Sequence, residues 1–447
     1  MHVCEPSPGA VGVPGSLMLD RRQFLTRSGV AAIAAAGLGE AHLSEVDAAE
    51  RTARAQGSQD SLQADGPLQY AVASDPAARL AAIPFHGAWQ AGIVNPPPPA
   101  ACFVSFNVTA TSRADLIDLL QTLTGRARFL TQGGLPPNPG PIQPPSDSGT
   151  LGPEIPADGL TVTVGFGSTL FDDRFGIADR KPKYLVEMTS FPNDDLNPNL
   201  CGGDLLLQIC AGSPDTAIHA LRDITKHTRG GMQIVWRMDG FVAPPRPAGL
   251  PRNHFGFMDG IANPNVTDPA VANRLMWVVP GIGEPEWAIG GTYQACRIIR
   301  MLIEFWDRVS LNEQQTMIGR YRASGNVLGT NSLTEPPDFA ADPRGKTIPL
   351  NAHIRLANPR TTDSEDSRIF RRGYNYDNGF DLAGNLDMGL IFNAFQQNLA
   401  RQFIATQTRL IGEPMVDYIS PVGGGYFFAL PGVSDSSDWY ARALFGA

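Results

Sequence analysis

Residues 204–237 read DLLLQICAGSPDTAIHALRDITKHTRGGMQIVWR, and this stretch carries the pattern that decides the fold. The apolar run at 204–211 predicts a buried strand, and Ser213 followed by a proline is typical of the start of a helix. Gly230 stands where that helix would end, and 232–237 returns to strand-forming residues. The stretch therefore predicts a strand, a helix and a second strand in this order.

The preceding part of the chain predicts the same order of elements. CFVSFNV at 102–108 has the composition of a strand, Ser112 is a suitable helix cap, and LTVTVGF at 160–166 predicts another strand. The segment 133–153 between them is rich in proline and glycine and predicts a long surface loop. Together these elements give the β-α-β-β-α-β order of a ferredoxin-like domain.

The second half of the chain repeats this order. Ser310 and Glu313 have the spacing of a capping box, in which each side chain satisfies the other residue's free backbone amide. The fold class is therefore α+β, with two ferredoxin-like domains of antiparallel sheets at 56–248 and 249–447. The remaining elements expected in the second half are strands at 292–305, 389–395 and 425–430 and a helix at 398–411.

The first 55 residues predict an export leader. Arg21 and Arg22 precede an apolar run of 11 residues at 29–39, which is the pattern of a twin-arginine signal. That run is shorter than the roughly 20 residues that span a bilayer, so removal near Gln56 is favoured over a retained transmembrane helix. We expect the twin-arginine export machinery as a partner, a periplasmic or extracellular destination, and no stable membrane insertion after processing. Because this route carries folded proteins, it also favours a cofactor inserted before export.

The composition limits the classes of function. A chain of 447 residues with 43% hydrophobic and 18% charged residues is typical of globular proteins, and its formal charge of −9 argues against a nucleic-acid surface. Its five cysteines show no CxxC or CxxCH spacing, which disfavours zinc ribbons, iron–sulfur clusters and covalently attached heme. Buried apolar cysteines are the favoured interpretation.

Five histidines outside the leader are candidates for a metal or an acid–base role. His219 and His227 fall on the helix that begins after Ser213, where a solvated or capping role is favoured over metal ligation. His86 lies in a loop without an acidic or cysteine neighbour. The remaining two are His254 and His353.

His353 and His254 each stand beside unusual neighbours. His353 is followed 18 residues later by the pair Arg371 and Arg372, and paired guanidinium groups suit a dianionic cofactor. His254 opens the segment HFGFMDG, in which Asp259 is held between aromatic residues and glycines at a tight turn. From spacing alone, an ordinary turn is as good an interpretation of this segment as a site.

The segment GFMDG resembles the GxxDG signature of dye-decolourising peroxidases, and other segments in the right order resemble that family over nearly the whole chain after the leader. The likeness is to its twin-arginine-exported branch, which includes proteins linked to ferrous iron uptake. These segments are IPFHGAWQAGI (83–93), VGFGSTLFDDRFG (164–176), CGGDLLLQIC (201–210), AIGGTYQACRIIRM (288–301), HIRLANPR (353–360), RRGYNY (371–376) and PVGGGYFFALPG (421–432).

The resemblance implies a site for one non-covalent heme b per chain in the C-terminal domain. It makes Asp259 the distal acid, Arg371 the distal arginine and His353 the proximal ligand of the heme iron. It also implies an acidic partner for the proximal imidazole, for which Asp387 is the candidate. The other cofactor-binding candidates are Arg372, Gly256, Phe257 and Gly260.

The resemblance further implies the reduction of hydrogen peroxide with dyes, phenols or other organic donors as reductants. In such a site Asp259 would move a proton between the peroxide oxygens, and Arg371 would stabilise the negative charge that develops. Because an unperturbed carboxyl has a pKa near 4, dye oxidation is expected to have an acidic optimum. Met258 and Gln294 depart from the commoner residues of the family at their positions.

Some alternatives remain open from the sequence. The protein could instead handle heme in the cell envelope and release its iron, as a deferrochelatase, or bind heme without catalysis. Trp306, Tyr374 and Tyr376 are candidates for electron relays to the surface, although ordinary aromatic packing is favoured for them. A homo-oligomer is also compatible with the sequence.

Overall fold

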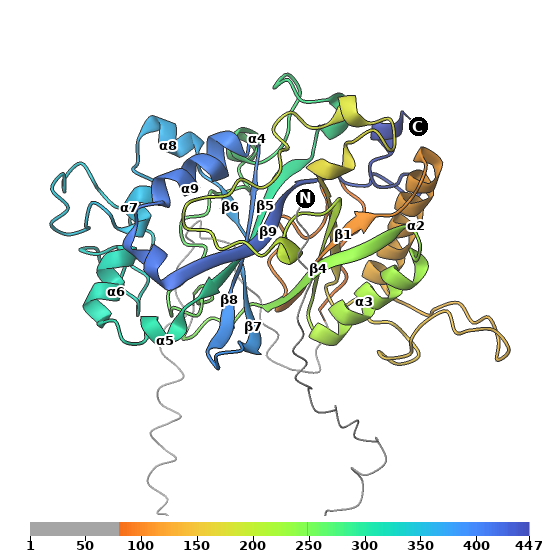
Figure 1. Ribbon diagram of the computed structural model, residues 1–447, viewed down its shortest axis with the longest axis horizontal. Helices are drawn as coiled ribbons and strands as arrows, with labels where there is room; N and C mark the ends of the chain where they lie inside the picture. The colour runs from red at the N-terminus through yellow and green to blue at the C-terminus, as the bar shows by residue number, and fades with distance from the viewer. Residues whose placement is uncertain (1–79, 248, 447) are drawn as a thin grey trace, which may run out of the picture. The chain divides into compact units, whose positions relative to one another are not determined.

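The computed structural model describes residues 80–247 and 249–446, and all of them fall within one compact unit (Figure 1). The predicted leader and its cleavage site lie outside the described residues. No helix within the described ranges is both long enough and apolar enough to cross a membrane.

The first half forms an antiparallel sheet with the strand order β2-β3-β1-β4. Two helices, α2 at Arg113–Gln132 and α3 at Pro214–His227, lie together over this half (Figure 1). Ser112 caps α2 by accepting a hydrogen bond from the amide of Asp115, which satisfies one of the free amides of the first turn. The strands are β1 at Ala100–Val108, β2 at Thr161–Gly167, β3 at Leu205–Ala211 and β4 at Met232–Phe241.

The second half adds five strands, and the two halves share one sheet. β2 pairs with β9 and β4 pairs with β7, and β5 also pairs with β8, so the sheet closes on itself as an antiparallel ring. The short strand β6 pairs with β8 beyond the end of β7. These strands are β5 at Thr292–Met301, β6 at Phe370–Arg371, β7 at Tyr374–Phe380, β8 at Leu386–Gln396 and β9 at Ile419–Ala429.

Short helices surround the strands of the second half. Helix α7 packs against α9, and a π-helical turn at Ala400–Ile404 leads directly into α9. The α-helices are α4 at Pro269–Leu275, α5 at Ile303–Trp306, α6 at Leu311–Ile318, α7 at His353–Ala357, α8 at Thr362–Asp366 and α9 at Ala405–Leu410. The 3₁₀ turns are Ser168–Leu170, Ala178–Arg180, Pro198–Leu200, Glu286–Ala288, Pro414–Tyr418 and Arg442–Phe445.

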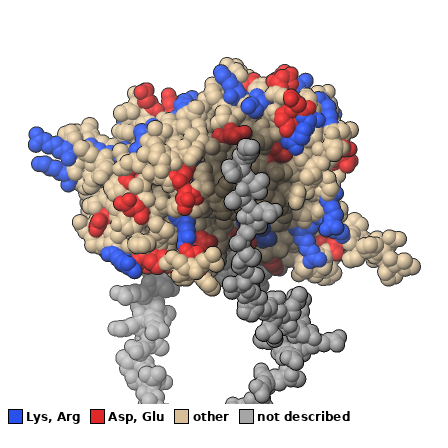
Figure 2. Space-filling view, viewed as in Figure 1, with Lys and Arg blue, Asp and Glu red and all other residues tan. Residues whose placement is uncertain are grey.

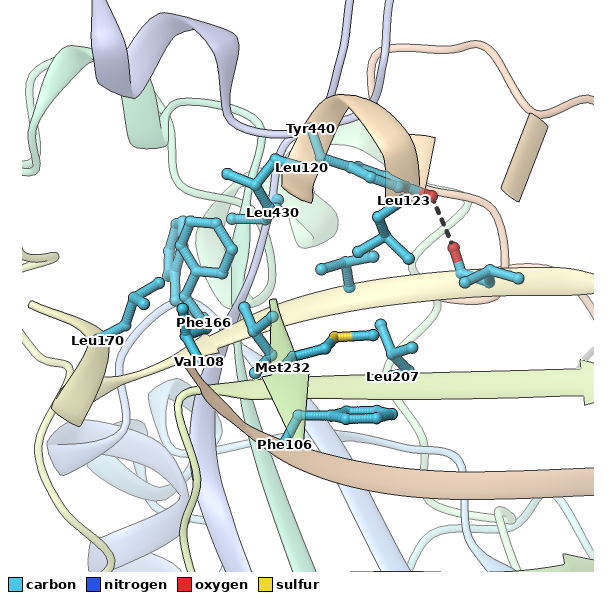
Figure 3. Packing of buried hydrophobic residues seen from close by; sticks show 14 of the residues in the cluster. Phe106, Val108, Leu120, Leu123, Phe166, Leu170, Leu207, Met232, Leu430 and Tyr440 are labelled. Carbon is cyan, nitrogen blue, oxygen red and sulfur yellow. Dashed lines mark hydrogen bonds between the residues drawn. The ribbon is translucent and has the colours of Figure 1, made fainter. Parts of the chain in front are cut away.

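Two buried faces result from this closure. The outer face of the first half packs under α2, where Leu120 and Leu123 meet Phe106 and Leu207 of the sheet (Figure 3). Tyr440 joins this core and donates a hydrogen bond to a carbonyl oxygen of β2 at 3.0 Å. A second cluster gathers side chains from strands all around the ring, and these residues fill its interior: Ala101, Phe103, Leu206, Cys210, Trp236, Met238, Cys296, Ile298, Tyr374, Tyr376, Ile391 and Phe427.

The surface carries both signs of charge. On the face shown in Figure 2, acidic and basic side chains lie interspersed among uncharged residues.

The loop predicted at 133–153 holds no helix or strand, and its isolated bridge joins Gly134 to Ile155.

The structure corrects several predicted boundaries. The strand expected at 292–305 ends at Met301, because α5 begins at Ile303. Ser310 accepts a hydrogen bond from the amide of Glu313, but the reciprocal bond of a capping box is not formed. β7 was not predicted at all.

Candidate functional site

His353 is the first residue of α7 and is held by a buried acid. Its Nδ1 lies 2.6 Å from Oε2 of Glu413, whose side chain is only 3% exposed. Glu413 follows α9, and Arg409 of α9 donates hydrogen bonds to the carbonyl oxygens of Leu356 and Ala357 at the end of α7. These contacts fix the imidazole through Nδ1, so Nε2 is the ring nitrogen that could bind a metal ion.

The predicted partner of His353 was wrong. Asp387 lies 4.0 Å from Nε of Arg300 and accepts a hydrogen bond from Asn378 at 3.3 Å. It lies in the β7–β8 hairpin region, where Arg300 also pairs with Asp381. The acid that the resemblance implied is therefore Glu413, 60 residues after His353 in the chain.

Asp259 lies on a loop that is fixed from both sides. The side chain of Asn253 accepts hydrogen bonds from the amides of Phe255 and Phe257, and Phe255 stacks on the buried ring of Trp306 at 4.2 Å. Gly256 and Gly260 adopt φ values of +83° and +87°, which residues with a side chain rarely adopt. The two glycines of the motif are thus required by the turns that present the acid.

Arg371 is the basic partner of Asp259. Its Nη1 lies 3.6 Å from Oδ1 of Asp259, and the two side chains are 27% and 26% exposed. Asn263 fixes the backbone of Arg371 by donating to its carbonyl oxygen at 2.7 Å and accepting from its amide at 3.1 Å. The amide of Gly260 donates to the same Oδ1 of Asp259 at 2.7 Å. The structure therefore brings together the acid and the arginine predicted for the peroxide side of a heme.

Oδ2 of Asp259 remains available on the other side of the carboxylate. No hydrogen bond within the described ranges uses this oxygen. A Cβ placed on Gly373 would lie 3.4 Å from it, so the glycine leaves space beside the oxygen. Asp259 can therefore use Oδ2 for a proton while Oδ1 stays bound to the backbone.

The turn at 319–325 connects the two predicted sides of the site. Gly319 lies directly against Ile354, the neighbour of His353, and Gly325 lies against Met258, the neighbour of Asp259. Arg320 of this turn donates a hydrogen bond to the carbonyl oxygen of Gly325 at 2.9 Å. The two parts of the site are thus joined through a few adjacent residues.

Arg320 gives the site an excess of positive charge. Burial, together with the nearby charges of Arg371 and Arg360, lowers the pKa of Arg320 to about 10. Burial also lowers the pKa of Arg360, despite Glu365 at 3.6 Å. A cluster of arginines that destabilise one another fits a group with carboxylates, such as the two propionates of heme. Together with an oriented imidazole, this donor set fits heme.

Arg372 does not join this cluster. Neighbouring residues of a strand face opposite sides of a sheet, and Arg372 is buried against Asn95 and Tyr374 rather than beside Asp259. This arrangement separates the side chain of Arg372 from that of Arg371, and its contact with a cofactor stays a prediction. Phe257, by contrast, belongs to a buried cluster with Phe255, Trp306 and Met317 that lies next to the Asp259 loop.

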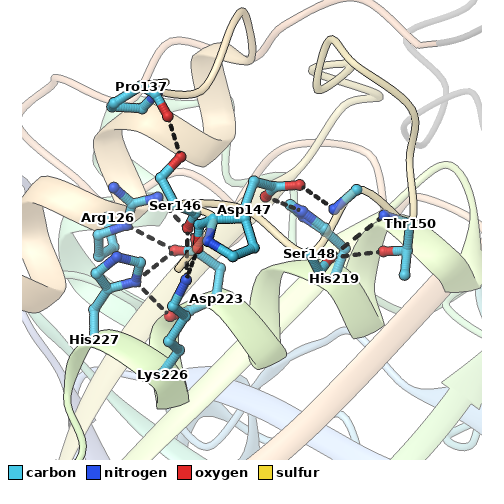
Figure 4. Close-up of polar contacts among 12 residues, drawn as sticks. Arg126, Pro137, Ser146, Asp147, Ser148, Thr150, His219, Asp223, Lys226 and His227 are labelled. Carbon is cyan, nitrogen blue, oxygen red and sulfur yellow. Dashed lines mark hydrogen bonds and ion pairs between the residues drawn. The ribbon is translucent and has the colours of Figure 1, made fainter. Parts of the chain in front are cut away.

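The other histidines have structural contacts. His219, predicted to be solvated or capping, is instead 2% exposed, and its Nε2 lies 2.6 Å from Oδ2 of Asp147 (Figure 4). Lys226 donates to the carbonyl oxygens of residues 145 and 146, so the proline-rich loop is attached to α3 at several points (Figure 4). Nδ1 of His227 lies 2.9 Å from the carbonyl oxygen of Asp223. His86 accepts a hydrogen bond from Arg128.

His254 supports the Asp259 loop. Its Nε2 lies 3.0 Å from the carbonyl oxygen of Tyr376, and burial lowers the pKa of its imidazole. Neutral His254 can donate this hydrogen bond without placing a charge in the partly buried loop. It is therefore a structural residue rather than a second ligand.

The candidate relay residues are buried. Trp306, Tyr374 and Tyr376 are each at most 2% exposed and belong to hydrophobic clusters. Of the four cysteines within the described ranges, Cys102, Cys210 and Cys296 are buried and Cys201 is partly exposed, and all four are free thiols.

Comparisons with known proteins found similar sequences over most of the chain. A family described as "Dyp-type peroxidase, N-terminal" matches residues 90–242, and one described as "Dyp-type peroxidase, C-terminal" matches residues 250–434. A protein of Escherichia coli K12 named Deferrochelatase is 49% identical over 374 residues, covering 83% of this chain and 88% of that protein. A Deferrochelatase of Yersinia pestis is 48% identical over 368 residues, covering 81% of this chain and 85% of that protein.

Solved structures of DyP-type peroxidases have a similar fold. A DyP-type peroxidase from Cellulomonas bogoriensis is similar with a TM-score of 0.73 and 32% identity, covering 82% of this chain and 99% of that chain. Ferric DtpA from Streptomyces lividans is similar with a TM-score of 0.74 and 29% identity, covering 82% of this chain and 98% of that chain.

Proposed function

This chain belongs to the Dyp-type peroxidase family, and we propose that its heme lies in the C-terminal half between His353 and the pair Asp259 and Arg371. The chain is a heme peroxidase that reduces hydrogen peroxide and oxidises organic donors. The observation that carries the residue assignment is the 3.6 Å approach of Arg371 to Asp259 in the loop of the GxxDG motif. Heme, when bound, supplies the iron and the electrons for the reduction.

On the proximal side, His353 would hold the iron of a bound heme through Nε2. Its Nδ1 is bound to Glu413, which is buried and so has little access to competing water. A carboxylate acceptor keeps the proton on Nδ1, fixes the orientation of the ring and makes Nε2 a stronger donor. Glu413 is thus the positioning residue for the ligand.

On the distal side, Asp259 moves the proton. Oδ2 accepts a proton from one oxygen of hydrogen peroxide and returns it to the other oxygen, which leaves as water. A bound heme would supply the two electrons for this cleavage and take up the remaining oxygen atom. The Gly260 amide holds Oδ1 throughout, so the carboxylate keeps its orientation. Arg371 remains protonated and stabilises the negative charge that develops as the oxygen–oxygen bond breaks.

Replacement of the acid by its isosteric amide tests this assignment. In Asp259→Asn the heme content should stay unchanged, while the second-order rate constant for reaction with peroxide falls about 10²- to 10⁴-fold. Asp417→Asn is the matched control, since Asp417 is an exposed acid of the same half. An Asp259→Asn protein that reacts with peroxide at the rate of the wild type would remove Asp259 from the catalytic step.

A second candidate function is the release of iron from heme. It is favoured by the relatives named Deferrochelatase, which are 48% and 49% identical to this chain. Incubation of the heme-loaded protein with a reductant and a ferrous chelator, with and without peroxide, should then yield intact metal-free porphyrin. Recovery of heme alone, or of porphyrin degradation products, would exclude this second function.

The site of action is proposed from the leader. Arg21 and Arg22 with the following apolar run support export by the twin-arginine machinery to the periplasm or the exterior. Export of a reporter fused to residues 1–55, and its loss in a variant with both arginines changed to lysine, is the direct measurement. Light scattering of the purified protein would measure its oligomeric state.

A further inference from the structure

Arg372 is a buried cation that the peroxidase site does not use. It is 4% exposed, and its side chain lies in the interior of the strand ring against Cys210 and Tyr374. Nη1 donates to the carbonyl oxygen of Asn95, while Nε and Nη2 have no hydrogen-bond partner. Each of these nitrogens carries a proton that needs an acceptor.

The neighbouring side-chain amides are occupied, and Tyr374 and Cys210, which lie against Arg372, bond to each other. The amides of Gln208, Gln294 and Asn393 bond to one another, with Gln294 donating to both partners at 3.1 and 2.8 Å and Asn393 donating to Gln208 at 2.9 Å. Tyr374 donates its hydroxyl proton to the sulfur of Cys210 at 3.3 Å. Burial raises the pKa of the Cys210 thiol, so this sulfur carries no negative charge near neutral pH.

Arg372 also lacks a counter-charge. No ion pair among residues 80–247 and 249–446 involves Arg372, although its neighbour Arg371 pairs with Asp259. An isolated charge in the interior of a protein is strongly destabilising, and a water molecule would satisfy the free protons but not the charge. An anion would satisfy both requirements.

We propose that the interior of the ring beside Arg372 binds one small monovalent anion of the size of chloride, held by Nε and Nη2 of Arg372. The strands close around it, and the segment 92–95 covers this end, where Gln208 donates to the carbonyl oxygen of Gly92 at 2.8 Å. A Cβ on Gly165 would already lie 3.1 Å from Phe427 and 3.3 Å from Gln294, so the packing in this region is tight.

The anion would hold the strand that carries the distal arginine. Arg372 follows Arg371 directly, and its backbone amide donates to the carbonyl oxygen of Asn393 at 2.7 Å. Neutralising Arg372 therefore stabilises β6 from the ring side while Asn263 holds it from the loop side. The anion contacts neither Asp259 nor the iron ligand, so its presence can be tested independently of peroxidase activity.

Bromide provides the direct test, because it replaces chloride and is visible by anomalous scattering. Crystals of the heme-loaded wild-type protein, grown from chloride-free solution and soaked in sodium bromide, should show an anomalous peak within hydrogen-bond distance of Nε and Nη2 of Arg372. Arg297 is the internal control. It is also buried with free Nε and Nη1, but it is paired with Asp194 and should show no peak.

A solution measurement accompanies the crystallography. At low millimolar concentrations, where the general stabilising effect of sulfate is small, the wild-type melting temperature should rise with chloride or bromide but not with sulfate at matched ionic strength, because only an anion that enters the ring binds the folded state. Arg372→Met should lose this halide dependence, whereas Arg229→Met, which removes an exposed arginine, should keep it. If Arg372→Met does not fold, the bromide map of the wild type decides alone. A water molecule in place of the peak, or equal halide and sulfate effects on the wild type, would overturn the proposal.

Discussion

Replacing Arg320 by methionine should make the heme-free protein more stable and its heme binding weaker. The pKa of Arg320 is lowered from the usual arginine value to about 10, first by burial and then by the charges of Arg371 and Arg360. At about 1.4 kcal/mol for each pKa unit, the surroundings oppose the charged form by about 3 kcal/mol. This cost exists in the heme-free protein at neutral pH, where Arg320 remains charged.

The substitution also removes a favourable contact. Arg320 donates a hydrogen bond to the carbonyl oxygen of Gly325 at 2.9 Å, and a hydrogen bond from a charged group contributes about 1.5–3 kcal/mol. Methionine has a similar apolar volume and retains most of the packing. We therefore expect heme-free Arg320→Met to be as stable as the wild type or up to about 1.5 kcal/mol more stable.

Heme binding should change in the opposite direction. If a propionate pairs with Arg320, loss of that pair should raise the dissociation constant for heme at least about tenfold, which corresponds to 1.4 kcal/mol. Urea unfolding of the heme-free proteins and heme titration followed at the Soret band measure the two effects. Arg308→Met is the control, because Arg308 is exposed and should change neither quantity. Unchanged heme affinity together with a stability loss above about 2 kcal/mol would refute the reasoning.

Three further changes follow from the structure. Glu413→Gln should retain heme but raise the midpoint potential of the ferric/ferrous couple, because a neutral acceptor makes His353 a weaker donor; a potential equal to that of the wild type in a redox titration would contradict this role. Burial lowers the pKa of His254, so between that lowered value and about 6.5 the unfolded chain binds more protons than the folded protein, and the free energy of unfolding falls as the pH falls. His254→Gln should flatten this part of the plot of stability against pH, and an unchanged slope would show that His254 does not cause the pH dependence. Leu120→Ala should lower the free energy of unfolding by about 2–5 kcal/mol, since Leu120 is fully buried under α2, and a loss below about 1 kcal/mol in urea unfolding would show that the core there relaxes.

The local elements of the fold could be predicted because their signals are local. Ser112 does cap α2, and the apolar run at 204–211 does form β3. The closure of the two sheets into one ring depends instead on pairs such as β2 with β9 and β5 with β8. Such pairings join residues far apart in the chain, and strand periodicity carries no information about which strand lies next to which.

In the site, too, residues with a local sequence signal could be predicted, and a contact between distant residues could not. Asp259 and Arg371 were found from motifs and do lie together. Glu413 was missed, because the contact with His353 crosses 60 residues and no spacing marks it. Asp387 was chosen in its place from its position near β8, which places it in another ion-pair cluster.

Two errors concern the direction of side chains. The pair Arg371 and Arg372 was treated as one unit, although consecutive residues of an extended segment face opposite sides. This alternation could have been read from the sequence, because the two arginines are adjacent in an extended segment. His219 was placed on the exposed side of α3, but the proline-rich loop folds over it and supplies Asp147. The position of a long loop cannot be read from its composition, so this burial had no signal.

The absorption spectrum of the heme-reconstituted protein tests the central claim most directly. Wild-type protein should bind one heme per chain with a Soret band that responds rapidly to peroxide, whereas His353→Ala should lose tight binding of the heme. Restoration of the band by added imidazole in His353→Ala would assign the loss to the iron ligand rather than to misfolding. A His353→Ala protein that retains heme with the spectrum of the wild type would contradict the account.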